Sequence, residues 1–187
     1  IALLDLLAGV TTDGRLRLVV AHVDHGIQPD SPAVAAAVQD LASQYGLGCE
    51  VGRLDLGPTA SETRARRARY QWLEATRSRL GADWLVTAHH RDDQVETVLL
   101  RTLRGSGPAG LAGMATRTRA GIVRPLLPFT REELAAHLVA RNLLAHQDPA
   151  NADPRHLRSW LRQTVLPALE ARLGPGVRDE LVRVAHH

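Results

Sequence analysis

The sequence predicts an α/β protein built on a doubly wound parallel sheet, with a short helical extension at its C-terminal end. Short apolar runs that suit buried strands alternate with amphipathic runs of helical period. Histidine and aspartate residues directly follow two of the apolar runs, where open α/β sheets bind their ligands. This alternation favours parallel strands joined by helical crossovers.

Capping residues and turn formers set the expected limits of the elements. Ser31 and Pro32 suit the N-cap and first turn of a helix, and Gly46 suits its end. The elements expected through the first two thirds of the chain are a helix over 1–8, a strand over 16–23, a helix over 31–46, a weaker strand over 49–55, a helix over 61–80, a strand over 84–88 and a helix over 92–104.

The last third of the chain is expected to be mostly loop and helix. Five glycines and a proline favour a loop over 105–121, before a last strand over 122–126. Thr130 and Glu133 have the spacing of a capping box, which predicts a helix start.

A turn-rich segment over 147–154 is expected to divide the chain into an α/β domain, 1–146, and a helical extension, 147–187. Pro167 is expected to kink the first helix of this extension.

Composition limits the class of protein. The 187 residues suit one domain with a small appendage, and a hydrophobic content of 44% is enough for a core. The longest apolar runs are too short for a membrane-spanning helix, and the first residues lack the basic flank of a signal peptide. Cys49 is the single cysteine, which excludes a disulfide framework. The expected location is therefore the cytoplasm.

The charge of the chain is modest but unusual in kind. The net charge is +3, and all 23 basic residues are arginine. Arginine binds phosphate through two parallel hydrogen bonds, so these side chains could support an RNA surface. A GC-rich genome would produce the same composition. Aromatic residues make up 3% of the chain, which argues against base stacking as the main binding mode.

The segment 87–97 is the densest cluster of chemical groups. His89, His90, Asp92 and Asp93 occupy five positions between an apolar run and an amphipathic run. A functional site and a solvated turn with an N-cap at Asp92 both explain it. Neighbouring histidines on a strand point to opposite faces, so no dedicated metal site is expected. Mg²⁺ carried by nucleotide phosphates is more plausible.

Two further clusters also admit two interpretations. Asp24, His25 and Gly26 end the strand over 16–23, where they could line the same crevice or only build a turn. Arg66 and Arg69 share one helical face, and this pair could hold a polyphosphate or form a solvated basic surface.

The C-terminal extension carries a row of arginines. Arg155, Arg158 and Arg162 fall on one helical face beside an apolar stripe. The row could face RNA phosphates, or it could belong to an ordinary amphipathic surface helix.

Taken in order, these segments resemble bacterial tRNA(Ile)-lysidine synthetase, a family of the N-type ATP pyrophosphatase (PP-loop) superfamily. The resemblance covers residues 20–165, about four fifths of the chain and nearly all of it outside the termini. The segments that carry it are 22–26, 62–70, 87–100, 104–107 with 110–114, 124–127, and 148–153 with Arg158 and Arg162.

The resemblance implies a ligase that converts the wobble cytidine of tRNA(Ile) with a CAU anticodon to lysidine. Its substrates would be ATP with Mg²⁺, L-lysine and the tRNA, and the protein could form a homodimer. The catalytic residues it implies are Asp93, Arg69 and His89, and the ATP-binding residues are Asp24, His25, Gly26 and Arg66. The residues it implies for the tRNA or substrate surface are Glu96, Arg104, Gly105, Gly107, Arg155, Arg158 and Arg162.

One motif of the family is absent from the printed sequence. The phosphate-binding loop Ser-Gly-Gly-x-Asp-Ser is not found, and residues 1–7 resemble the helix that follows it. We therefore expect these 187 residues alone to bind ATP poorly and not to turn over. Lysine transfer by the purified 187-residue chain would contradict this expectation.

Two alternatives stay open at the level of sequence. A tRNA thiolase of the same superfamily would be expected to use cysteine pairs, and the single Cys49 counts against it. A truncated, non-catalytic tRNA-binding fragment would keep the arginines and lose the chemistry.

Overall fold

The computed structural model describes residues 1–11, 16–26, 31–57, 59–144 and 157–185. The chain divides into two compact units. The N-terminal unit comprises Leu4–Leu85, and the C-terminal unit comprises Ile1–Leu3 with Val86–His187. The division predicted after residue 146 falls outside the described residues and stays a prediction. The two compact units meet in sequence within the short strand at 85–86.

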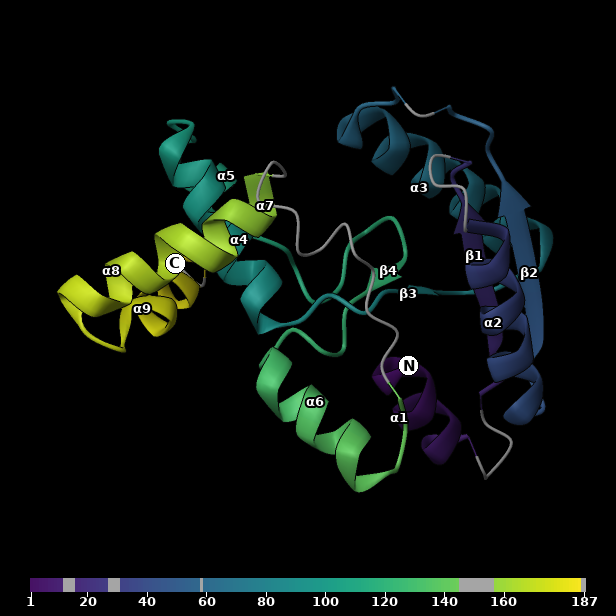
Figure 1. Cartoon of the computed structure of the whole chain (residues 1–187). Helices are drawn as coiled ribbons and strands as arrows, with labels where there is room; N and C mark the ends of the chain where they lie inside the picture. Colours follow the sequence, from purple (N-terminus) through teal and green to yellow (C-terminus); the bar gives the residue numbers. More distant parts are fainter. Residues whose placement is uncertain (12–15, 27–30, 58, 145–156, 186–187) are drawn as a thin grey trace. The chain divides into compact units, whose positions relative to one another are not determined.

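The N-terminal unit contains a parallel pair of strands with helices packed beside it (Figure 1). The strands pair in register from Val19 opposite Gly48 to Asp24 opposite Arg53. Parallel pairing requires a crossover, and α2 supplies it. The elements are α1 (Ala2–Val10), β1 (Val19–Asp24), α2 (Ser31–Gln44), β2 (Gly48–Arg53) and α3 (Glu62–Arg79).

Local sequence explains how α3 begins and where it lies. Ser61 is its N-cap, and the Oγ atom accepts a hydrogen bond from the Arg64 N–H at 3.3 Å. Trp72 of α3 packs against Gly52 of β2 so closely that a Cβ at Gly52 would lie 2.1 Å from the indole ring. Glycine at this position therefore lets α3 approach the strand pair.

The C-terminal unit is mainly helical. Its short strand pair, β3 with β4, precedes and follows the long helix α4 in the chain. The elements are β3 (Leu85–Val86), α4 (Arg91–Leu103), α5 (Pro108–Leu111), β4 (Ile122–Val123), α6 (Arg131–Ala140), α7 (Leu157–Trp160), a π-helical segment (Leu161–Val165), α8 (Leu166–Leu173) and α9 (Val177–Val184).

The fold class predicted from sequence is confirmed as α/β, with differences in detail. The described strands form two pairs, and β3 and β4 are only two residues long. The capping box before α6 is confirmed, because Glu133 accepts from the Thr130 N–H at 2.7 Å while Thr130 Oγ1 accepts from the Glu133 N–H at 3.1 Å.

Two local predictions were wrong. Asp92 is not the N-cap of α4, because the helix begins at Arg91 and His90 is the capping residue. The segment 105–121 is not all loop, because Pro108 opens the short helix α5. The kink expected at Pro167 stays a prediction: the proline lies in the first turn of α8, directly after a π-helical segment.

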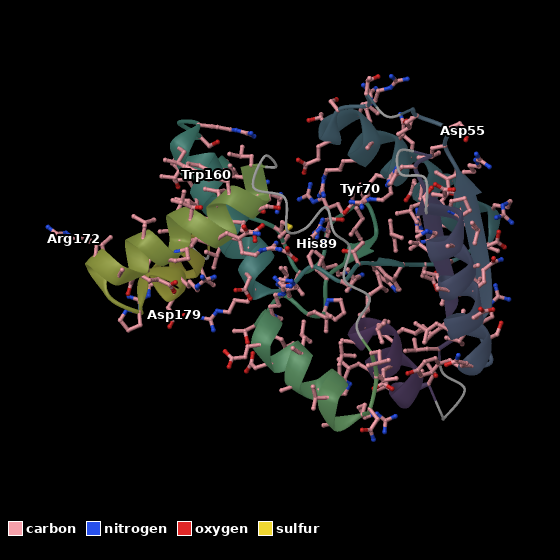
Figure 2. The ribbon with its side chains drawn as sticks, viewed as in Figure 1. Asp55, Tyr70, His89, Trp160, Arg172 and Asp179 are labelled. Carbon is pink, nitrogen blue, oxygen red and sulfur yellow. The ribbon has the colours of Figure 1, made fainter. Side chains whose placement is uncertain are left out.

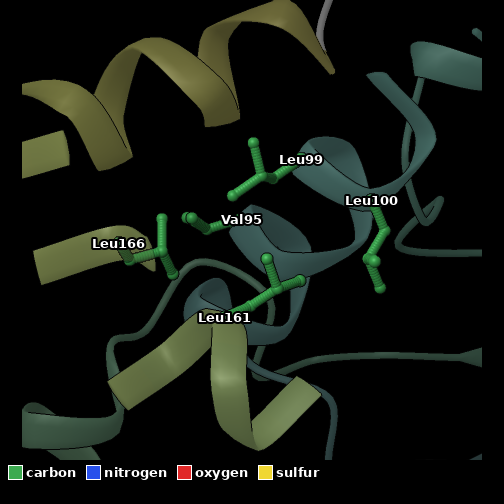
Figure 3. Close-up of a cluster of buried hydrophobic side chains, with 5 residues drawn as sticks. All are labelled: Val95, Leu99, Leu100, Leu161 and Leu166. Atoms are coloured by element: carbon green, nitrogen blue, oxygen red, sulfur yellow. The ribbon is translucent and has the colours of Figure 1, made fainter. Parts of the chain in front are cut away.

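The core of the C-terminal unit lies between α4 and the C-terminal helices (Figure 3). Leu161 and Leu166 are fully buried against α4, and each such side chain stabilises the fold by about 1.5–3 kcal/mol. The five buried residues of this core are Val95, Leu99, Leu100, Leu161 and Leu166. Leu103 of the same helix is 64% exposed because it lies in the last turn of α4, beyond this packing.

Within the described ranges, the structure has no helix with the length and apolar character needed to cross a membrane.

Candidate functional site

In the N-terminal unit, the carboxyl end of β1 forms a tight turn at Asp24, His25 and Gly26. The Asp24 carboxylate is buried, and its Oδ1 atom accepts a hydrogen bond from the Gly26 N–H at 2.7 Å. Gly26 has a φ of +63°, and a Cβ there would lie 3.0 Å from Asp55 Cα. Both the backbone conformation and the close approach therefore require glycine.

The Asp24 carboxylate is already engaged by the protein. A hydrogen bond from the Ser31 side chain lowers its pKa most, and the Gly26 N–H lowers it further, while burial opposes them. Asp24 thus joins the end of β1 to the first residue of α2. Its carboxylate is therefore bonded to protein donors at this turn.

The surroundings of His25 lower its pKa, which favours the neutral imidazole. Burial lowers its pKa most, the Arg69 guanidinium lowers it further, and Asp24 opposes both. Its Nδ1 atom is enclosed and has no hydrogen-bond partner among the described residues. The electrostatic effect of Arg69 on His25 shows that the predicted residues at the end of β1 and on α3 lie near one another in the N-terminal unit.

Arg66 and Arg69 both lie close to the ring of Tyr70 on α3, and Figure 2 shows where Tyr70 lies. The guanidinium carbons lie 5.0 Å and 5.7 Å from the ring centroid, within the range of cation–π attraction. Burial lowers the pKa of Arg69 most, and the neighbouring Arg66 lowers it further. Tyr70 and Glu62 raise this pKa and so offset part of the shift. Neither arginine forms an ion pair with a carboxylate in the described part of the chain. The pair is therefore suited to bind an anion from outside the protein.

In the C-terminal unit, the segment after β3 positions His89. The Thr87 N–H donates to the Val123 carbonyl at 2.9 Å, which ties this segment to β4. Thr87 Oγ1 and His89 Nδ1 are 2.9 Å apart, and His89 is half-buried (Figure 2). The threonine thus fixes the orientation of the imidazole.

Asp93 lies in the first turn of α4. Its Oδ2 atom accepts a hydrogen bond from the His90 N–H at 3.0 Å, which closes the start of the helix. The His90 Nε2 atom lies 3.6 Å from the same oxygen. No described residue donates a hydrogen bond to Asp93 Oδ1. One carboxylate oxygen of Asp93 is thus anchored at the start of the helix.

Glu96, Arg158 and Arg162 form one buried ion-pair cluster. The Glu96 side chain is fully buried, and its Oε1 atom accepts from Arg162 Nε at 2.7 Å. Arg158 NH1 lies 3.4 Å from Glu96 Oε2. Burial raises the pKa of Glu96 and so does Asp93, while Arg162 and Arg158 oppose them. The structure therefore gives these predicted tRNA-facing residues partners within the protein, and Arg155 lies outside the described residues.

The glycine-rich segment after α4 is pinned to that helix. The Met114 N–H donates to Gln94 Oε1 at 2.7 Å, and Gln94 Nε2 donates back to the Met114 carbonyl at 3.1 Å. Arg101 NH1 donates to the carbonyls of Gly110 and Gly113, each at 2.7 Å. Side chains of α4 therefore hold the backbone of the segment that was predicted to face tRNA. The predicted contacts within it, Arg104, Gly105 and Gly107, are exposed.

Two residues near these elements were not among the predicted site residues. Arg124 directly follows β4 and is 7% exposed, with NH1 donating to the Ala115 carbonyl at 2.7 Å. Its Nε atom is buried without a partner in the described part of the chain. Tyr70 contacts both candidate phosphate-binding arginines. The spacing of Arg66 and Tyr70, one helical turn apart, was the available signal.

The described residues contain no group of three or more His, Cys, Asp or Glu side chains placed to hold a metal ion.

Comparison with known proteins places the chain in a family. The model described as the PP-loop domain matches residues 1–169. The chain belongs to the PP-loop domain family. A protein named tRNA(Ile)-lysidine synthase from Salinispora arenicola is 49% identical over 169 residues, covering 87% of this chain and 51% of the relative. One of the same name from Methylococcus capsulatus is 41% identical, covering 99% of this chain and 43% of the relative.

The chain spans about half the length of the curated relatives it matches. It covers 51% of the Salinispora arenicola protein and 51% of a relative of the same name from Salinispora tropica, which is 48% identical. A solved structure of the U34-tRNA thiolase NcsA from Methanococcus maripaludis, with its [4Fe-4S] cluster, aligns with a TM-score of 0.77. This likeness covers 99% of this chain and 67% of the thiolase at 18% sequence identity. At that identity it shows the shared PP-loop fold and nothing finer.

Proposed function

We propose that this chain carries the catalytic domain of an ATP-dependent ligase that converts the wobble cytidine of a CAU-anticodon tRNA(Ile) to lysidine. The main support is the 49% and 48% identity, over 169 residues each, to two relatives named tRNA(Ile)-lysidine synthase. The ordered motifs, from the turn at Asp24 to the cluster at Asp93, support the same reaction. In this proposal the protein works in the cytoplasm, where its tRNA is found.

The reaction has two steps. In the first, the C2 oxygen of the cytosine attacks the α-phosphorus of ATP, and pyrophosphate leaves. In the second, the ε-amine of L-lysine attacks C2, a proton leaves the nitrogen, and the C2–O bond breaks to release AMP. Adenylation thus turns a poor leaving oxygen into a good one. The site must hold a flipped-out base and keep water from the activated carbon.

In the N-terminal unit, we assign the phosphates of ATP to Arg66 and Arg69. The two guanidiniums share a helical face and have no ion-pair partner among the described residues. Arg69 would stabilise the charge that develops on the phosphates as pyrophosphate leaves. Asp24 and Gly26 hold the neighbouring turn, and neutral His25 is a hydrogen-bonding group beside it.

In the C-terminal unit, we assign the second step to Asp93 and His89. Asp93 Oδ1 would accept the proton that lysine must lose before its nitrogen can attack. Its other oxygen is fixed by the His90 N–H, so the carboxylate keeps one orientation. His89, oriented by Thr87, would hydrogen-bond the activated base or the nucleotide.

We assign fewer residues to the tRNA surface than the resemblance implies. Arg104, Gly105 and Gly107 are exposed and remain candidate tRNA contacts. Glu96, Arg158 and Arg162 would act from within, by holding the C-terminal helices on α4. Mg²⁺ is proposed to arrive on the ATP phosphates. The carboxylates of Asp24 and Asp92 already accept hydrogen bonds from protein N–H groups, so we do not assign a metal ion to them.

The partial reactions test this proposal. The protein is expressed from the complete gene and incubated with ATP and a CAU-anticodon tRNA(Ile) transcript, with and without L-lysine. We expect AMP release that depends on both lysine and tRNA. Asp93→Asn should lower it by at least about a hundredfold, while Arg183→Ala, an exposed change on α9, should leave it unaltered. AMP release that requires a sulfur donor in place of lysine would instead favour a thiolase. Specific tRNA binding without AMP release would favour a non-catalytic module.

A further inference from the structure

We propose that Arg178 of α9 is a positioning residue for Asp93, because it fixes the first turn of α4 from the C-terminal helices. The inference rests on the proposed function for its catalytic consequence, whereas the anchoring itself can be measured without any activity. Arg178 lies beyond residue 169, where the match to the PP-loop domain ends.

The Arg178 guanidinium joins two helices through two carboxylates. NH1 donates to Asp92 Oδ1 of α4 at 3.1 Å. Nε and NH2 donate to the two oxygens of Glu170 on α8, at 2.7 Å and 3.2 Å. The side chain of Arg178 is 29% exposed, and those of Asp92 and Glu170 are 20% and 25% exposed. The hydrogen bond to Glu170 does most to raise the pKa of Arg178. Solvent therefore screens these pairs less than it screens pairs on an open surface.

The next residue of α9 makes the reciprocal contact. Arg91 NH2 of α4 donates to Asp179 Oδ1 at 2.7 Å. Two adjacent residues of α9 thus pair with two adjacent residues of α4, with the charges exchanged. The two pairs therefore favour the same relative register of the two helices.

The opposite oxygen of Asp92 is held by a third helix. Asp92 Oδ2 accepts a hydrogen bond from the Arg131 N–H at the start of α6, at 2.8 Å. Asp92 is therefore bound from α9 through one oxygen and from α6 through the other. Asp93 is the next residue in the same turn, so the direction of its carboxylate depends on how this turn is held. Displacement of a catalytic group by about 1 Å can cost a hundredfold in rate.

The contact can be removed without undocking α9. Leu181 and Val182 of α9 pack against the buried core of the unit independently of the ion pairs. Arg178→Ala should therefore leave the fold intact and loosen only the start of α4. Arg178→Lys keeps the charge but not the planar fork, so it should bridge Asp92 and Glu170 poorly. Arg183→Ala is the matched control, because Arg183 lies on α9 and pairs only with exposed Glu180 at 3.1 Å among the contacts described.

The experiment uses the protein expressed from the complete gene, with two readouts. The first is amide hydrogen exchange at the start of α4, where the Gln94 N–H donates to the His90 carbonyl at 3.2 Å, against exchange at Val98 and Leu99. Arg178→Ala should speed exchange at the start by at least about fivefold and leave Val98 and Leu99 unchanged. The second is lysidine formation, for which kcat should fall about tenfold with the KM for ATP and for tRNA within about twofold. Arg178→Lys should fall between Arg178→Ala and the unaltered protein.

The two readouts separate the possible failures. Unchanged exchange at the start of α4 in Arg178→Ala would overturn the anchoring. Faster exchange with unchanged kcat would overturn the positioning role. A wild-type protein that forms no lysidine would refute the proposed function and with it the catalytic consequence, and the exchange measurement would still decide the anchoring. An effect of Arg183→Ala equal to that of Arg178→Ala would show that any loss of charge on α9 suffices, which would also overturn the proposal.

Discussion

Arg162 donates from Nε to Oε1 of Glu96 at 2.7 Å, and the two residues are 66 positions apart in the chain. Glu96 lies on α4 less than one turn after Asp93, and its side chain is fully buried. The helix that carries the proposed proton acceptor is therefore bound to the C-terminal helices by charge as well as by apolar packing.

We predict that Arg162→Ala destabilises the C-terminal unit by about 3 kcal/mol, because it leaves a buried carboxylate with only the longer contact to Arg158. Glu96→Gln should cost less, about 1 kcal/mol, because the amide keeps an acceptor oxygen without the buried charge. Native-state hydrogen exchange at the Val98 and Leu99 amides measures both losses. Arg183→Ala should stay within about 0.5 kcal/mol of the unaltered protein. A loss in Arg162→Ala no larger than that would contradict the assignment.

The cost of Arg162→Ala should also depend on pH. Burial raises the pKa of Glu96 above its ordinary value of 4.5, and loss of Arg162 removes a group that opposes this rise. A carboxyl whose pKa is raised by folding favours the folded state at low pH and loses that contribution as pH increases through the raised pKa. The variant should therefore be penalised more at pH 8 than at pH 5. A penalty that does not change with pH would show that Glu96 stays equally ionised in both proteins.

Asp24 should show the opposite pH dependence. Its pKa is lowered in the folded protein, chiefly by the Ser31 side chain, from an ordinary value of 3.8. Its contribution to stability is therefore present above that value and is lost as pH falls through the lowered pKa. We predict that Asp24→Asn is less stable than the unaltered protein at pH 6 and that the difference shrinks toward pH 3. Thermal unfolding measures this, with exposed Asp40→Asn on α2 as the control. Parallel curves for all three proteins would contradict the prediction.

Alanine substitutions at Gly113 and Gly105 test how firmly Gln94 holds the glycine-rich segment after α4. Both have left-handed backbones, with φ of +64° and +70°. A Cβ at Gly113 would lie 2.5 Å from Gln94 Nε2, whereas a Cβ at Gly105 would meet nothing within 4 Å. Gly105→Ala should therefore cost only the backbone term of about 1 kcal/mol, and Gly113→Ala should cost clearly more. Equal losses of unfolding free energy in urea titrations would show that Gln94 can move aside freely.

Tyr70 should affect the affinity for phosphates through its ring. Tyr70→Phe keeps the surface that Arg66 and Arg69 flank, so the Kd for ATP should change less than about twofold. Tyr70→Leu removes that surface and should weaken ATP binding by about two- to fivefold. Isothermal titration measures both affinities. Equal affinities for the two variants would mean that the ring does not orient the guanidiniums.

The helix and strand pattern was predictable because its signals are local. Ser61 caps α3, and the Thr130–Glu133 capping box starts α6, as their spacing indicates. The start of α4 was misplaced because Asp92 has the chemistry of an N-cap but accepts hydrogen bonds from Arg178 and from the Arg131 N–H instead. Its partners are 86 and 39 residues away. No local pattern carries that information.

The sequence proposes which residues form the candidate site, but it does not predict their contacts. The motif at 87–97 predicts His89 and Asp93 as site residues, and the structure adds the groups that hold them, Thr87 and the His90 N–H. Arg158 and Arg162 share a helical face, as the sequence indicates, but that face meets Glu96. Periodicity defines which residues lie together on a helix. What the shared face contacts depends on tertiary packing.

The most direct test of the central claim is the mass of the wobble nucleoside. A CAU-anticodon tRNA(Ile) transcript is incubated with ATP, L-lysine and the protein expressed from the complete gene, then digested and analysed by mass spectrometry. The account predicts that cytidine at the wobble position gains the mass of lysine less one water, that the gain requires ATP, and that Asp93→Asn abolishes it. An unmodified wobble cytidine from active, folded protein, or a gain of sulfur in place of lysine, would contradict it.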